Sequence, residues 1–170
     1  MLELLAPAGN LDAVIAAVQN GADAVYMGFG DGFNARRSAD NFTQESFAKA
    51  VRYCHIRGCK VYVTLNTLVG DREMDAAAAL AQQASDAGAD AILVQDLGLA
   101  RVLRAALPDI PLHASTQMSI HNLAGVEAAA EMGITRAVLA RELSLEQIRF
   151  ISQHASIETE VFVHGALCFC

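Results

Sequence analysis

A short pattern occurs three times in this chain, and each copy joins the end of a predicted helix to the start of a predicted strand. The copies lie at residues 20–25, 87–92 and 132–138, and the second residue of each copy is a glycine. Glycine suits the position just after a helix because it adopts a left-handed backbone conformation without steric cost. A repeated unit of this kind predicts a fold built by adding one strand and one helix at a time.

Strand and helix patterns alternate along the whole chain, which is typical of βαβ units and a parallel sheet. Ser144 with Gln147 predicts a capping box, and Asn10 and Asp71 are predicted N-caps. We expect strands near residues 2–6, 23–28, 60–65, 90–95, 111–115, 136–140 and 158–163, and helices near 11–20, 44–57, 72–87, 97–107, 122–132 and 145–153.

This repeated unit predicts an α/β fold, a (β/α) barrel of the TIM type. A complete barrel needs about 250 residues, so residues 1–170 are expected to form a single, incomplete N-terminal barrel domain that stops before the eighth unit. The strands near 2–6 and 158–163 would then each have an open edge. Open edges of apolar strands recruit other chains, so we expect the chain to form a homo-oligomer through them.

Composition narrows the class of protein. The chain is 54% hydrophobic but only 6% aromatic, as in α/β proteins whose parallel strands are buried on both faces. Its net charge of −7 argues against a nonspecific nucleic-acid binder, which needs clustered Lys and Arg. No apolar run reaches the roughly 18 residues of a membrane span, and no basic segment precedes the first strand. We therefore expect a cytoplasmic protein that does not enter a membrane.

The predicted strand bodies are almost wholly apolar, but polar side chains follow most of them. Because parallel strands of a barrel end on the same face, these side chains should converge on a polar pocket for a small hydrogen-bonding ligand or a base. Asp96 has a simpler interpretation as a helix cap, and His113 is compatible with either a structural or a ligand-binding role. Arg141 and Glu142 are adjacent and should point to opposite sides. The candidates are Asn34 and Arg36 in the long loop 28–41, Asn66, Gln95, His113, Ser115, Gln117, Arg141, Glu142 and His164.

The four cysteines argue against a disulfide framework in a cytoplasmic protein. Cys54 and Cys59 are expected to be buried, inert thiols. His164 and Cys168 are four residues apart in the C-terminal segment, a spacing that allows contact across one helical turn. The pair is compatible with a Cys–His nucleophile for peptide hydrolysis. It is equally compatible with a thiolate iron ligand beside a histidine.

The C-terminal segment resembles the signature E-x-F-x-x-G-[AS]-x-C of the U32 peptidase family, also called collagenase-like proteases. The matching residues are Glu160, Phe162, Gly165, Ala166 and Cys168. Other segments also resemble the family, in family order, so the resemblance covers essentially the whole chain. They lie at residues 4–9, 21–26, 33–36, 63–67, 113–117 and 139–144.

The resemblance implies an enzyme. Several family members carry a cysteine-bound iron–sulfur cluster and support hydroxylation of RNA bases or of quinone precursors, so we expect iron–sulfur-dependent hydroxylation of an RNA base. Cys168 would be one ligand of a [4Fe–4S] cluster in the full-length protein, with the others beyond residue 170, and the 170-residue chain alone should hold none. Arg141 would clamp a small carboxylate co-substrate. Two alternatives stay open: a cysteine-type peptidase that cleaves protein substrates with Cys168 and His164, and a barrel fragment without activity. On this interpretation the catalytic residues are His164, Cys168, Arg141 and Glu142, and the substrate-binding residues are Asn34, Arg36, Asn66, Gln95, His113 and Gln117.

Overall fold

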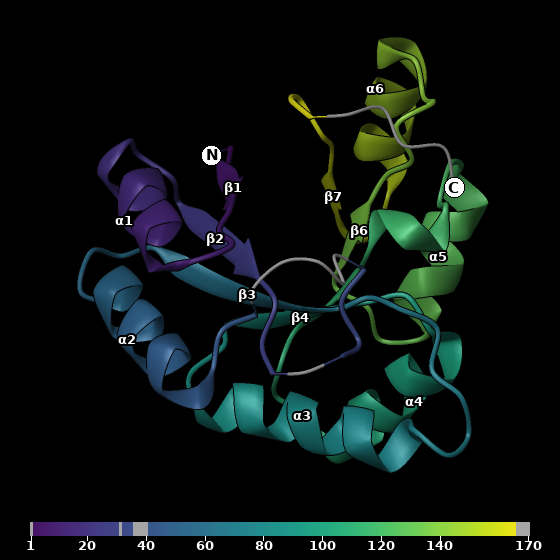
Figure 1. The fold of residues 1–170 in the computed structure, drawn as a ribbon. Coiled ribbons are helices and arrows are strands. Elements are labelled where there is room, and N and C mark those ends of the chain that lie inside the picture. Colours follow the sequence, from purple (N-terminus) through teal and green to yellow (C-terminus); the bar gives the residue numbers. More distant parts are fainter. Residues whose placement is uncertain (1, 31, 36–40, 166–170) are drawn as a thin grey trace.

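The computed structural model describes residues 2–30, 32–35 and 41–165, which form a curved seven-stranded sheet with helices along its outer side (Figure 1). The predicted incomplete barrel of seven strands and six helices is confirmed. The strands are β1 (Leu5–Pro7), β2 (Ala24–Met27), β3 (Lys60–Leu65), β4 (Ala91–Val94), β5 (Leu112–Ala114), β6 (Arg136–Val138) and β7 (Glu158–Glu160). The helices are α1 (Leu11–Gln19), α2 (Gln44–His55), α3 (Met74–Asp86), α4 (Leu97–Ala106), α5 (Leu123–Glu131) and α6 (Leu145–His154), with a short 3₁₀ helix η1 (Thr116–Met118) after β5.

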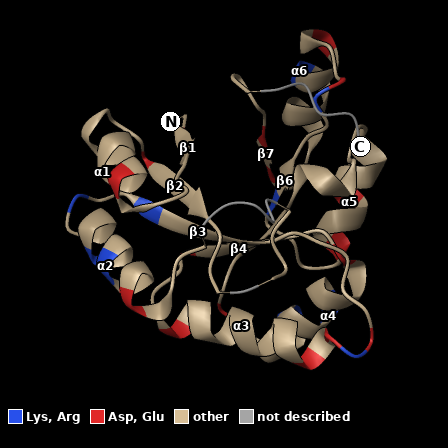
Figure 2. Cartoon of the chain, viewed as in Figure 1, with Lys and Arg blue, Asp and Glu red and all other residues tan. Residues whose placement is uncertain are grey.

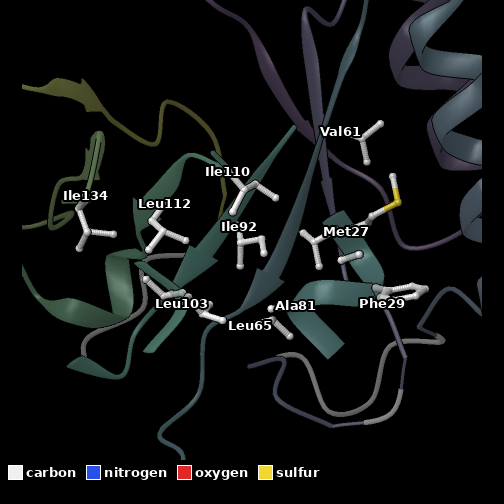
Figure 3. Packing of buried hydrophobic residues seen from close by; sticks show 14 of the residues in the cluster. Met27, Phe29, Val61, Leu65, Ala81, Ile92, Leu103, Ile110, Leu112 and Ile134 are labelled. Carbon is white, nitrogen blue, oxygen red and sulfur yellow. The ribbon is translucent and has the colours of Figure 1, made fainter. Parts of the chain in front are cut away.

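The strands lie in sequence order from β1 to β7, and every neighbouring pair is parallel. Alternate strand residues face the helices and form the main core, in which Val61, Ile92 and Leu112 are fully buried (Figure 3). The intervening residues, such as Tyr62 and Leu93, belong to a second, smaller cluster on the concave side. Within the described residues, no helix is long and apolar enough to cross a membrane.

Most of the predicted helix ends are confirmed. The Asn10 side chain accepts a hydrogen bond from Ala13 N at 2.8 Å, and Ser144 forms the complete capping box with Gln147. Asp96 caps α4 by accepting from Leu99 N at 2.8 Å, which supports its simpler interpretation. The glycines that follow helices all have positive φ, as a residue after a helix C-terminus requires: Gly21, Gly58, Gly88 and Gly133.

Helix α3 departs from the prediction at its start. It begins at Met74 rather than near residue 72, and the predicted N-cap Asp71 is wrong. Residues 70–73 form a turn instead, in which Glu73 N donates to the Gly70 carbonyl oxygen at 2.8 Å. The Glu73 carboxylate accepts from Gly70 N at 2.9 Å, so the side chain stabilises the turn and makes no capping bond to the helix.

Strand β7 is shorter than predicted. It ends at Glu160, and the expected buried run to residue 163 is wrong. Val161 and Phe162 are each 38% exposed and Val163 is 86% exposed. The physical reason is the position of β7 at the end of the sheet order, where it pairs with β6 alone. A β-branched and aromatic run becomes a buried strand only when both of its faces are covered.

The concave side of the sheet carries an ion cluster at the amino-terminal ends of the strands, which we call the floor cluster. Arg136 is only 8% exposed and joins β6 to distant parts of the chain. It contacts Glu3 Oε1 at 2.6 Å, Glu158 Oε2 at 2.6 Å and Glu160 Oε2 at 3.4 Å. The expectation of almost wholly apolar strand bodies is therefore wrong on this face. The other members are Tyr62, whose hydroxyl donates to Glu3 at 2.9 Å, and Lys60, whose Nζ lies 3.2 Å from Glu3.

The open edges give a testable expectation. Strands β1 and β7 each pair on one side only, and apolar side chains beside them are exposed, among them Leu2 at 97% and Val163 at 86%. Because unpaired edges beside apolar surface recruit other chains, we predict that this chain forms dimers or larger assemblies at micromolar concentration. Light scattering in dilute buffer of physiological ionic strength measures the mass. A monomer with ordinary cooperative unfolding would contradict the prediction.

Candidate functional site

The carboxyl-terminal ends of β3, β4 and β5 bring polar side chains together, as predicted, and we call this group the rim. Asn66 Nδ2 donates to Ser115 Oγ at 3.1 Å, which joins the ends of β3 and β5. Gln95 Nε2 donates to the Gln117 carbonyl oxygen at 3.4 Å, which joins β4 to η1. Gln117 N also donates to Ser115 Oγ at 3.3 Å, so the Ser115 side chain caps η1 directly after β5. The rim is thus a connected set of amides and a hydroxyl.

The loop after β2 also reaches the rim. Ala35 N donates to Asn66 Oδ1 at 3.2 Å, and Asn34 is buried, with its Nδ2 donating to Asn41 Oδ1 at 3.0 Å. A Cβ atom at Gly28 would collide with both of these asparagine amides, so glycine lets the Asn34–Asn41 bond lie against the backbone. The structure therefore places the predicted residue Asn34 in the segment that bonds to Asn66. The predicted residue Arg36 lies outside the described residues.

His113 lies deeper than predicted. It occupies the middle of β5 rather than the strand end, and it is 4% exposed. Its ring meets Tyr62 edge-on, with centroids 4.9 Å apart, and its Nδ1 atom has no hydrogen-bond partner among the described residues. Burial lowers the pKa of His113 to about 3, and the positive charge of Arg136 adds to the effect. The imidazole is therefore neutral near pH 7 and offers hydrogen bonding without charge, below the rim.

On the other side of the site, Arg141 follows β6 and its guanidinium carbon lies 4.1 Å from the ring centroid of Phe162. Glu142 and His164 are exposed, whereas Arg141 is partly buried. The neighbours Arg141 and Glu142 therefore differ in environment, as their adjacency predicted. The described part of the chain gives His164 no hydrogen-bonding partner that would orient its ring. Cys168 lies outside the described residues, so its contact with His164 and its role as a metal ligand stay predictions.

Sequence reasoning missed Phe162 as a member of the site. The sequence draws attention to it only as part of a family signature, within a strand expected to be buried. A signal was present, because Phe162 continues the two-residue alternation of Glu158 and Glu160, which both contact Arg136 on the concave side. This alternation favours a position for the ring at the carboxyl end of β7, beside the rim.

The two described cysteines are buried thiols, as predicted. Burial raises the pKa of Cys54 to about 12, and burial also raises the pKa of Cys59. Both thiols are therefore protonated near pH 7, whereas a metal ligand must be a thiolate. Among residues 2–30, 32–35 and 41–165, no three His, Cys, Asp or Glu side chains are grouped to hold a metal ion. The described part of the chain supplies no complete metal site.

Several known proteins are similar to this chain along nearly its whole length. The chain is 44% identical over 167 residues to the 23S rRNA 5-hydroxycytidine C2501 synthase of Escherichia coli, a match that covers 98% of the chain and 25% of that protein. It is 41% identical over 166 residues to tRNA hydroxylation protein P1 of Bacillus subtilis, covering 98% and 39%. It is also 34% identical over 178 residues to a collagenase of Porphyromonas gingivalis, covering 98% and 42%. The chain thus spans well under half the length of these relatives.

The solved structure of the U32 peptidase Mk0906 has the same fold. It superposes with a TM-score of 0.78 at 17% identity, over 95% of this chain and 68% of the other. At that identity the likeness concerns the fold alone. Residues 9–170 match the sequence profile described as peptidase family U32. Since this match covers nearly the whole chain, the protein belongs to peptidase family U32.

Proposed function

We propose that the full-length protein containing this chain supports hydroxylation of an RNA base, and that the base or a small carboxylate co-substrate binds at the rim. The observation that carries the proposal is the uncharged polar cluster at the strand ends, in which Asn66, Ser115 and the backbone of Gln117 are joined by hydrogen bonds. Amides and hydroxyls can recognise the edges of unpaired bases through hydrogen bonds. The names of the first two relatives, an rRNA hydroxycytidine synthase and a tRNA hydroxylation protein, agree with this choice.

The proposed roles follow from position. Arg141 would clamp a carboxylate through paired N–H donors, and the exposed residues Glu142 and His164 would act beside the reacting atoms. A protein that modifies ribosomal or transfer RNA would work in the cytoplasm, as the sequence predicts. The proposed substrate-binding residues are Asn34, Arg36, Asn66, Gln95, His113 and Gln117.

The proposed cofactor is a [4Fe–4S] cluster, which would supply electron transfer when bound. Four thiolates hold such a cluster, but Cys54 and Cys59 are buried and have raised thiol pKa values. Cys168, the cysteine that matches the family signature, is the proposed ligand from this chain. The remaining ligands would come from cysteines outside this sequence, which is much shorter than its relatives.

The proposal can be tested by measuring the modified nucleosides in ribosomal and transfer RNA of the organism that carries the gene. Deletion of the gene should remove one hydroxylated pyrimidine nucleoside from digests of ribosomal or transfer RNA, as measured by mass spectrometry. Expression of the full-length protein should restore it. A deletion strain whose ribosomal and transfer RNA nucleosides are all unchanged would overturn the proposal.

The collagenase relative favours a second candidate, a cysteine peptidase that uses Cys168 and His164. Such a pair needs a histidine held in a productive orientation, and His164 is exposed without an orienting partner in the described part of the chain. We therefore predict no cleavage of gelatin by highly purified full-length protein. Cleavage that persists through purification, is blocked by alkylation of Cys168, and is lost in both Cys168→Ala and His164→Ala would support the peptidase instead. Absence of both activities would leave the third candidate, an inactive barrel fragment.

A further inference from the structure

The carboxyl ends of β6 and β7 hold a stacked pair of side chains. The guanidinium carbon of Arg141 lies 4.1 Å from the ring centroid of Phe162. Just before this pair, Leu139 N donates to the Glu160 carbonyl oxygen at 2.9 Å. Strand β6 ends at Val138 and β7 ends at Glu160. The stacked pair therefore lies beyond both strand ends, where the two chain segments leave the sheet side by side.

Phe162 does not serve the hydrophobic core. It is 38% exposed, whereas the core residue Phe47 is fully buried. Arg141 lies over one face of the Phe162 ring, and the exposed 38% of the residue leaves surface that a ligand can reach. Planar guanidinium groups stack well on aromatic rings, and a ring held from one side can receive a second planar group on the other.

The charge of the chain indicates what kind of RNA contact is possible. Residues 1–170 carry a net charge of −7, so attraction to phosphates contributes little affinity in this part of the protein. Figure 2 shows the Lys and Arg residues scattered over several helices and strands of the described chain. Recognition of unpaired RNA also uses bases stacked on aromatic rings or guanidinium planes, with hydrogen bonds to the base edges.

We propose that Arg141 and Phe162 form a stacking platform for an unpaired RNA base. The inference rests on the proposed function and adds how the RNA is held. The platform lies beside the rim, because Ala140 N donates to the Ile120 carbonyl oxygen at 2.8 Å and so joins the segment before Arg141 to the segment after η1. A base stacked on Phe162 would therefore lie on the side of the site where the chain leaves η1.

A fluorescent reporter tests the platform directly. Residues 1–170 contain no tryptophan, so Phe162→Trp adds one indole at an exposed position, and its emission is the difference between the variant and the unsubstituted full-length protein. Addition of a single-stranded oligoribonucleotide should reduce the indole emission of this variant at least about twofold, because a stacked base quenches the indole. The same sequence annealed into a duplex should not, because its bases are already stacked. Raising the salt concentration about fourfold should weaken binding only about threefold, as for roughly one phosphate contact.

Phe150 provides the matched control. It is 53% exposed on α6 and also lies against a planar side chain, with its ring centroid 4.5 Å from that of His154. Phe150→Trp should show no quenching. Equal quenching of both reporters, or none in Phe162→Trp, would overturn the platform. Two further variants separate stacking from charge: Phe162→Leu should weaken binding about tenfold, and Arg141→Lys, which keeps the charge but not the plane, should also weaken it.

The platform and the proposed function fail in different ways. Hydroxylation that depends on the gene, together with unquenched emission from Phe162→Trp, would refute the platform and leave the function standing. Quenching in Phe162→Trp without gene-dependent hydroxylation would support the platform as an RNA-binding element and refute the chemistry.

Discussion

Replacement of Arg136 by methionine should lower the free energy of unfolding by about 3–5 kcal/mol, because it leaves buried carboxylates without their partner. Arg136 is 8% exposed, and the side chains of Glu3 and Glu160 that contact it are 22% and 17% exposed. The third partner, Glu158, has a side chain that is 68% exposed, so solvent screens its charge and its contribution is small. The stability that Arg136 supplies therefore comes mainly from Glu3 and Glu160.

Urea denaturation near pH 7 measures this loss. Arg149→Met on the exposed surface of α6 is the matched control and should change stability by less than about 0.5 kcal/mol. Addition of Glu3→Gln to Arg136→Met should recover part of the loss, since it removes one stranded charge. A loss below about 1 kcal/mol for Arg136→Met, well under that expected for a broken buried pair, would show that the floor cluster is marginal.

The floor cluster also predicts that the free energy of unfolding depends on pH, with opposite contributions from Glu3 and Glu160. Burial raises the pKa of Glu3, but hydrogen bonds from Arg136 and Tyr62 outweigh it and bring the pKa down to about 2. Glu3 therefore stabilises the fold above its ordinary pKa of 4.5, and this stability is lost as the pH falls towards about 2. Burial raises the pKa of Glu160, so its protonation favours the fold in acid. In Arg136→Met, the free energy of unfolding should fall less steeply between pH 4.5 and about 2, because Glu3 has lost the partner that lowers its pKa. Urea denaturation at a series of pH values measures this slope.

Cys168→Ala in the full-length protein should reduce RNA hydroxylation to the level of the deletion strain, because a cluster ligand must be a thiolate. Cys59→Ala is the matched control, since Cys59 is buried with a raised thiol pKa and should not bind iron. Nucleoside mass spectrometry of complemented strains measures hydroxylation, and visible absorbance of the purified variants reports the cluster. Hydroxylation and absorbance that both survive in Cys168→Ala would rule out its role as a ligand.

Much of the fold could be predicted because its signals are local. Positive-φ glycines such as Gly88 and Gly133 follow helix ends, and the capping box at Ser144 depends on residues three apart. The convergence of Asn66 and Gln95 was also predictable, since parallel strands of a barrel end on one face. Their connection through Ser115 and η1 was not, because a three-residue 3₁₀ helix leaves almost no pattern in a sequence.

The floor cluster could not be predicted in the same way. Glu3 and Arg136 are 133 residues apart, and their contact depends on which face of the sheet each side chain meets. A weaker signal was available in Glu158 and Glu160, which share a face because they are two residues apart, together with an arginine in a strand that is otherwise apolar. The exposure of Phe162 was unpredictable for a related reason, since burial of an edge strand depends on its neighbour.

The iron and acid-labile sulfide content of the full-length protein, purified without oxygen, tests the central claim most directly. We expect about four irons and four sulfides per chain, as a [4Fe–4S] cluster requires. The 170-residue chain alone should hold no stable cluster, because it has four cysteines and two of them, Cys54 and Cys59, are buried thiols. A full-length protein that stays colourless and iron-free after anaerobic reconstitution would contradict iron–sulfur-dependent hydroxylation.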